Sequence, residues 1–70
     1  MKKAKHYRLV VTDPYREVVL TATGAMGDDG TEVYVDDTGA VRAEIDRDGA
    51  VRTVTTTLPI GRPARAEPLD

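Results

Sequence analysis

The fold of this chain is constrained most by turn signals that interrupt every stretch long enough to form a helix. Short valine-rich runs, such as Leu9-Val10-Val11 and Val33-Tyr34-Val35, alternate with clusters of Gly, Pro and Asp. Apolar β-branched runs bounded by such clusters are typical of strands. We therefore predict an all-β fold, an antiparallel meander of about five strands between Lys5 and Leu58.

The first predicted hairpin turns over Asp13-Pro14-Tyr15-Arg16. Pro in the second turn position, with Asp before it, indicates a type I turn. A turn at these residues makes one face of the hairpin apolar, because side chains alternate between the two faces of a strand. The pairs expected on that face are Val11 with Val18, Leu9 with Leu20, and Tyr7 with Ala22.

An internal repeat predicts the next two turns. The segment Asp36–Arg42 is echoed ten residues later by Asp46–Arg52, and each copy carries Gly-Ala-Val-Arg at its end. A three-residue loop closed by Gly suits both turns, because Gly adopts the left-handed conformation without strain. The expected pairs are Val35 with Val41, Val33 with Ala43, Ile45 with Val51, and Ala43 with Thr53.

This register also predicts the outer face of the sheet and a fault in the fifth strand. Val51 and Val54 fall on opposite faces, so either a bulge near Thr55 or closure of this strand against the first strand is expected. The outer face then carries two rows, one of Tyr34, Arg42 and Val54, and one of Glu32, Glu44 and Arg52.

The chain divides into three parts on composition. Residues 1–4 are a basic arm, residues 5–58 are a single β domain, and residues 59–70 carry three prolines and almost no periodicity. Such a Pro-rich segment is typical of an extended or disordered tail.

No helix is available to cover the apolar face of the sheet, so the sheet must curl or find a partner. We expect a strongly curled sheet or small barrel, with packing against a second copy as an open alternative. The residues expected to fill it are Tyr7, Leu9, Val11, Val18, Leu20, Val33, Val35, Val41, Ile45 and Val51.

Composition excludes several chemistries. The chain has no cysteine and no serine, and His6 is its single histidine, so Ser/His and Cys/His nucleophiles are excluded. Glu32 and Glu44 face each other in the expected register, but carboxylates on an open sheet are usually solvated. We expect no enzyme activity and no cofactor. The apolar run after the basic start is too short for a signal peptide or a membrane span, which makes a cytoplasmic location the expectation.

Two ligand sites are weighed as alternatives. A weak cation site is conceivable where one loop and one turn share an end of the sheet, at Asp28, Asp29, Asp46 and Asp48. Single-stranded nucleic acid could bind a basic N-terminal face, although the net charge of −2 gives no general attraction to phosphate. The residues of that face are Lys2, Lys3, Lys5 and Arg8.

The leading hypothesis is a non-enzymatic binding or accessory module that acts through protein contacts, including contacts with a second copy. It rests on the missing catalytic residue types, on a sheet face without helical cover, and on free strand edges. The residues expected to contact a partner lie on the outer face and the irregular strand: Tyr34, Arg42, Val54, Arg52 and Glu44.

Two segments carry a family resemblance. Tyr7-Arg8-Leu9-Val10 and the stretch from Val33-Tyr34-Val35 through Ile45 lie in a pattern covering roughly residues 2–53. The pattern resembles a family of short uncharacterised actinobacterial proteins, classified as a domain of unknown function. The resemblance supports the fold and implies no activity.

Overall fold

Six β-strands make up the computed structural model, which describes residues 4–57 and 61–69. A short 3-10 turn, η1 (Asp28–Gly30), lies between the second and third strands, and no helix in the described ranges has the length and apolar character to cross a bilayer. The strands are β1 (His6–Thr12), β2 (Arg16–Met26), β3 (Glu32–Val35), β4 (Val41–Ile45), β5 (Val51–Thr56) and β6 (Arg62–Pro68).

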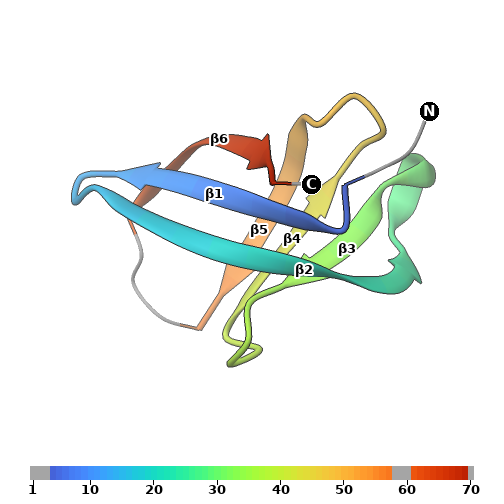
Figure 1. Ribbon diagram of the computed structural model, residues 1–70, viewed down its shortest axis with the longest axis horizontal. Helices are drawn as coiled ribbons and strands as arrows, with labels where there is room; N and C mark the ends of the chain where they lie inside the picture. The colour runs from blue at the N-terminus through green and yellow to red at the C-terminus, as the bar shows by residue number, and fades with distance from the viewer. Residues whose placement is uncertain (1–3, 58–60, 70) are drawn as a thin grey trace.

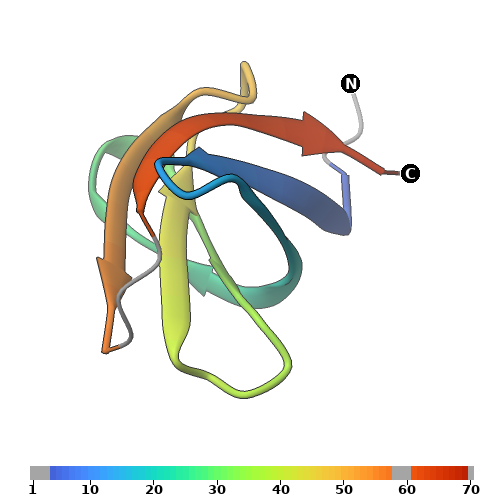
Figure 2. The same cartoon turned by 90° about the vertical axis from the view of Figure 1, so that its left-hand side faces the viewer.

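The strands form one antiparallel sheet in the order β5-β4-β3-β2-β1-β6. The sheet curls into a nearly closed barrel whose two edges, β5 and β6, come near each other (Figures 1 and 2). The predicted all-β class and strong curl are confirmed. One strand more than expected is present.

The additional strand corrects the predicted disordered tail. Residues 62–68 form β6, which pairs with β1 from Tyr7↔Pro68 to Thr12↔Arg62. Prolines misled the prediction, since Pro is usually read as a strand breaker, yet an edge strand tolerates it where its nitrogen faces outward. The backbone N–H of Leu69 bonds to His6 O at 3.0 Å, so the nitrogen of the preceding residue, Pro68, faces away from β1.

The β1–β2 hairpin has the predicted faces but not the predicted pairs. Leu9 lies opposite Val18 and Tyr7 opposite Leu20, a shift of two residues from the expected register. Arg16 already pairs with Val11 in the ladder, and Asp13 has φ 63°, so the connection Asp13–Tyr15 is not the expected type I turn. A shift of two residues leaves each side chain on its original face.

The β3–β4 turn is one residue longer than expected, and this exchanges the inward and outward faces of β3. The backbone N–H of Asp36 bonds to Val41 O, and Tyr34 pairs with Ala43, in place of the predicted Val35–Val41 and Val33–Ala43 pairs. A shift of one residue exchanges the two faces of a strand. Tyr34, expected on the outer face, is therefore inside and only 1% exposed.

The β4–β5 turn has the predicted three-residue loop, with Gly49 at φ 87° and the Ile45–Val51 pair. Beyond that pair the register shifts, so that Ala43 pairs with Val54 and not with Thr53. The extra residue is Arg52, which places the bulge earlier than the predicted site near Thr55. The bulge turns Val51 and Val54 toward the same face, and β1 is flanked by β6 rather than by β5.

The core occupies the inside of the curl. Two tyrosines organise it: the rings of Tyr7 and Tyr34 meet edge to face, with centroids 5.0 Å apart, and Tyr34 Oη donates a hydrogen bond to Ala4 O at 2.6 Å. Val33 is buried but lies outside this cluster, on the face opposite the predicted one. The buried cluster comprises Ala4, Tyr7, Leu9, Val11, Leu20, Tyr34, Val41, Ala43 and Ile45.

Candidate functional site

A groove of 540 Å³ runs along the seam where the barrel stays open. Within the described ranges, β5 and β6 each pair with a neighbour on one side, β4 and β1 respectively. Figure 2 shows these two strands as the edges of the curled sheet. The lining comes from both edges: Gly49, Ala50, Val51, Arg52, Thr53, Val54, Pro63, Ala64, Arg65 and Ala66.

Backbone groups of both strands point into the groove. The N–H of Thr57 bonds to Ala40 O, and the alternation of an antiparallel ladder then directs Thr53 and Thr55 toward β4 and Val54 toward the groove. The same alternation on β6 directs the backbone of Ala66 toward the groove. Val54 and Ala66 thus present backbone donors and acceptors on the groove side of their strands, as unpaired strand edges do.

Part of the groove surface is apolar. Val51, Val54 and Ala66 are partly buried and pack against the core cluster. The exposed sides of these three side chains are core surface that a seventh strand in the sheet would cover. Apolar surface beside open backbone groups is the combination that strand-adding sites use.

The rim of the groove is basic. Arg52 on β5 is held through its Nε by Asp46 at 3.1 Å, and Arg65 on β6 is held through its Nε by Glu67 at 2.8 Å. Both guanidinium side chains stay mostly exposed, at 67% and 61%. None of the described residues that line the groove is acidic.

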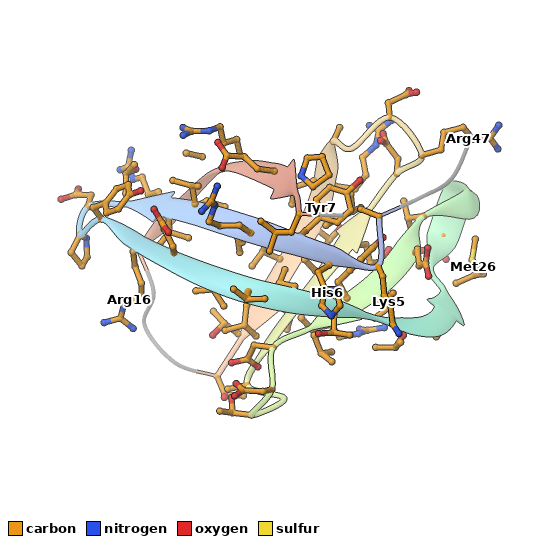
Figure 3. The ribbon with its side chains drawn as sticks, viewed as in Figure 1. Lys5, His6, Tyr7, Arg16, Met26 and Arg47 are labelled. Atoms are coloured by element: carbon orange, nitrogen blue, oxygen red, sulfur yellow. The ribbon has the colours of Figure 1, made fainter. Side chains whose placement is uncertain are left out.

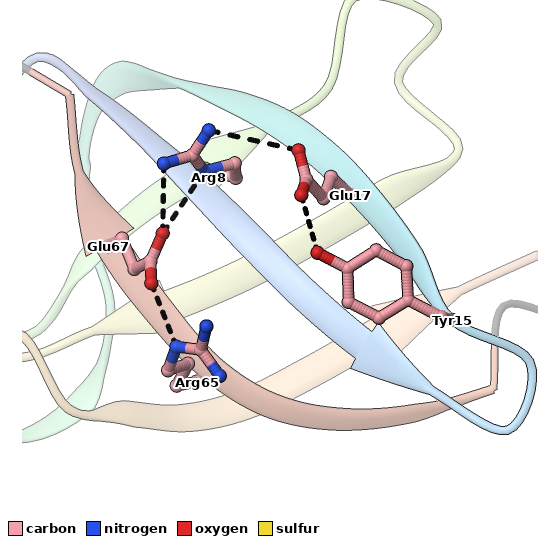
Figure 4. Close-up of polar contacts among 5 residues, drawn as sticks. All are labelled: Arg8, Tyr15, Glu17, Arg65 and Glu67. Atoms are coloured by element: carbon pink, nitrogen blue, oxygen red, sulfur yellow. Dashed lines mark hydrogen bonds and ion pairs between the residues drawn. The ribbon is translucent and has the colours of Figure 1, made fainter.

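A wider ion-pair network fixes the β6 side of the rim (Figure 4). Glu67 accepts bonds from Arg65 and from Arg8, whose Nη2 lies 3.0 Å from it, and Arg8 also lies 3.7 Å from Glu17. Tyr15 donates to Glu17. The hydrogen bonds from Arg65 and Arg8 lower the pKa of the Glu67 carboxyl. This network ties β6, β1 and β2 together across their outer face.

The structure separates the residues that were predicted to contact a partner. Arg52 and Val54 line the groove, whereas Tyr34 is buried in the core. Arg42 and Glu44 lie on the outer face of β4, away from the groove. The predicted outer row of Tyr34, Arg42 and Val54 is wrong, because the longer turn and the bulge move two of its three members inside.

The basic face predicted for nucleic acid is only partly described. Lys2 and Lys3 lie outside the described residues, and Arg8 forms ion pairs with Glu67 and Glu17. Figure 3 shows Lys5 at the start of β1 and Arg16 at the far end of the β1–β2 hairpin. These described cations do not form one patch. Nucleic-acid binding stays an untested prediction.

The predicted cation site also stays untested. Asp46 uses its Oδ1 to accept the backbone N–H groups of Asp48 and Ala50, at 2.9 Å each. The hydrogen bond from Ala50 is the main reason that the pKa of Asp46 is lowered. Among the described residues, which exclude the Asp29 side chain, no group of three acidic or histidine side chains is placed to hold a metal with Asp28 or Asp46.

The expected Glu32–Glu44 pair does not form. Glu32 lies opposite Ile45 and Glu44 opposite Val33, which puts the two carboxylates on opposite faces of the sheet. Glu44 Oε1 instead accepts a hydrogen bond from Thr31 Oγ1 at 3.1 Å. The reason is the same shift of one residue in β3 that buries Tyr34.

Sequence reasoning missed the β6 half of the groove. The signal was present as an alternation of small and charged residues, with Ala64 and Ala66 on either side of Arg65. That period of two is weaker than a valine alternation and is flanked by Pro63 and Pro68, so the local sequence predicts a tail here and not a strand.

Curled sheet and open groove together define a class: small antiparallel barrel-like proteins with one unpaired seam. The chain belongs to a family of unknown function, DUF6296, whose pattern matches residues 1–70. No curated protein and no solved structure matches the chain. The predicted resemblance to a family of unknown function is therefore confirmed. The actinobacterial source stays a prediction.

Proposed function

We propose that this chain is a non-enzymatic binding module that takes up an extended segment of a protein partner between β5 and β6. The observation that supports the proposal is the groove at the seam, where the apolar side chains of Val51, Val54 and Ala66 lie between two strand edges with backbone groups directed inward. Strand addition at such an edge draws affinity from main-chain hydrogen bonds and specificity from alternate side-chain pockets.

The groove suits a chain segment better than a compact metabolite. Its lining follows six consecutive residues of the β4–β5 turn and β5, from Gly49 to Val54, and four residues of β6, from Pro63 to Ala66. No buried charged or nucleophilic side chain lies among these described residues, and this supports a role in contacts. Such a shape fits an extended backbone.

The test is a selection with a random twelve-residue peptide library displayed on phage. Ala64→Trp fills the groove from an exposed position, and Ala25→Trp places the same side chain at an exposed position of β2 outside the groove. We expect the wild-type chain and Ala25→Trp to enrich a common set of peptides and Ala64→Trp to lose that set. Enrichment of the same peptides by Ala64→Trp would overturn the proposal.

A selected peptide should then be mapped by amide chemical shifts. The expected shifts fall on residues 51–54 and 64–66, with smaller changes on the outer faces of β2 and β3. Shifts confined to those outer faces would place the binding surface elsewhere. Thermal melts of both tryptophan variants check that each one folds.

A further inference from the structure

We infer that the segment taken up in the groove is acidic, and that it adds to β5 as an antiparallel strand with carboxylates against Arg52 and Arg65. This inference rests on the proposed function, because it names the chemistry of the partner for the same groove. It is carried by three features of the seam: the relative direction of its edges, the distribution of proline, and the charge of its rim.

The opposite directions of β5 and β6 mean that a single added strand cannot pair with both edges in the same way. Every neighbouring pair in the sheet is antiparallel, so β5 and β6 also run in opposite directions across the seam. A strand laid between them is antiparallel to one edge and parallel to the other. It can form antiparallel hydrogen bonds, the slightly more stable kind, with one edge only.

Proline selects β5 as that edge. β6 contains Pro63 and Pro68, and the nitrogen of Pro68 is on the side away from β1. Proline on an outward position removes a donor and protects an edge from pairing. β5 has no proline between Val51 and Thr56, and its Val54 backbone is directed into the groove.

The rim selects the charge. Arg52 and Arg65 flank the groove from opposite edges, and the carboxylates that hold them are already shared with other donors. Asp46 accepts two backbone N–H groups besides Arg52, and Glu67 accepts Arg8 besides Arg65. Each exposed guanidinium has donors beyond its Nε, and a bidentate fork prefers a carboxylate.

A second copy of the chain is disfavoured by the same charges. Its own open edges carry Arg52 on β5 and Arg62 and Arg65 on β6. Edge-to-edge docking of two copies would therefore bring arginines together at the seam. Like charges placed opposite each other on a sheet are destabilising.

The experiment compares matched peptides in place of an unidentified ligand. Three fluorescein-labelled decapeptides with alternating valine carry glutamate, glutamine or lysine at the remaining positions, and binding is followed by anisotropy at low and moderate salt. The proteins are the wild-type chain, the double variant Arg52→Gln/Arg65→Gln, and Arg47→Gln. Arg47 lies exposed in the β4–β5 turn outside the groove, which makes its variant a control for the loss of a surface positive charge (Figure 3).

We expect the glutamate peptide to bind the wild type and Arg47→Gln most tightly and to lose about three- to tenfold in affinity for the double variant, as two partly exposed ion pairs imply. N-methylation of alternate amides tests the pairing. Methylation of the set that faces β5 should abolish binding, and methylation of the other set should not, because β6 is not paired.

The outcomes separate this inference from the proposed function. Equal binding of all three peptides would overturn acidic selectivity and leave peptide uptake standing. Failure of every peptide, together with a failed library selection, would overturn both. Tighter binding of an unstructured oligothymidine at the same salt would overturn the acidic-peptide inference. A dimer in light scattering that the glutamate peptide does not dissociate would overturn it too.

Discussion

At the scale of single residues, the interior depends on how its polar atoms are satisfied. Tyr34 places a hydroxyl inside the curl, and that hydroxyl bonds to Ala4 O at 2.6 Å. A buried hydroxyl without a partner costs free energy, so this bond both permits the burial of Tyr34 and holds the chain before β1 against the barrel. The edge-to-face contact with Tyr7 adds about 0.5–1.5 kcal/mol.

The first prediction concerns that hydroxyl. Tyr34→Phe keeps the ring contact but leaves Ala4 O without this donor, and we expect the free energy of unfolding to fall by about 1–3 kcal/mol. Urea denaturation measures the loss. The control is Tyr15→Phe, which removes a hydroxyl that is exposed on the outer face and should change stability by less than about 0.5 kcal/mol. Equal effects of the two variants would contradict the role given to Tyr34.

The second prediction concerns acid. The N–H of Val41, supported by Thr38, bonds to the Asp36 carboxylate and lowers its pKa below the ordinary 3.8. The folded state therefore binds fewer protons than the unfolded state near that pH, and the stability from Asp36 is present above 3.8 and is lost as pH falls through the lowered pKa.

Asp36→Asn keeps an acceptor oxygen in the turn but does not titrate. Its melting temperature should therefore fall less steeply with acidification than that of the wild type, with a remaining slope from Asp46 and Glu67, whose pKa values are also lowered. Thermal melts between neutral and strongly acidic pH measure the two slopes. Parallel curves would show that Asp36 contributes nothing to acid sensitivity.

At the scale of elements, side-chain alternation could be predicted and loop length could not. The valine pattern assigned β1 and β2 to their correct faces, because a shift of two residues preserves facing. It failed for β3, where one additional residue in the turn reversed Tyr34 and separated Glu32 from Glu44. Two near-identical repeat segments thus form loops of different length, and no local signal in the sequence distinguishes them.

Half of the candidate site was within reach of the sequence. The irregularity of β5 was visible, and Arg52 and Val54 were among the residues expected to contact a partner. The other half depends on the long-range pairing of β6 with β1, which joins residues far apart in the chain and leaves little local pattern. Edge-strand prolines then obscured what pattern there was.

The third prediction concerns the start of β6. Gly61 has φ +85°, and a Cβ there would lie 2.6 Å from Thr12 O. Gly24 has nearly the same φ, +86°, but open space around it. Backbone strain alone costs about 1–3 kcal/mol, so we expect Gly24→Ala to lower the free energy of unfolding by that amount. Gly61→Ala should lower the free energy of unfolding by at least about 1 kcal/mol more, as urea denaturation of the two variants would measure. Similar losses would show that the approach of Gly61 to the β1–β2 connection can relax.

At the scale of the whole molecule, the barrel is strong around β1 and open at the seam. β1 has a hydrogen-bonded neighbour on each side and carries the fully buried Leu9 and Val11, whereas β5 and β6 each have one neighbouring strand within residues 4–57 and 61–69. Stability is therefore expected to be uneven, with the core strands opening last.

The fourth prediction follows from this gradient. Amide hydrogen exchange should be slowest in the middle of β1 and fast at Val54 and Ala66, whose N–H groups are directed into the groove. Addition of the glutamate decapeptide should slow exchange at Val54 and leave Ala66 nearly unchanged. Protection at Ala66 alone would place the added strand on β6.

The strand order has a further consequence for how the chain folds. Read from β6, the sheet runs β6-β1-β2-β3-β4-β5. This is the order of a simple meander, except that its first strand, β6, comes last in the sequence. The hydrogen bond from Leu69 N–H to His6 O shows that the start of β1 and the end of β6 lie side by side. A circular permutant that joins these ends through a short linker, and opens the chain between Thr57 and Gly61, would make every strand pair a neighbour in sequence. Lower contact order favours faster folding. Its refolding should be faster than that of the natural order, and the two edge strands β5 and β6 would no longer be joined directly by the chain.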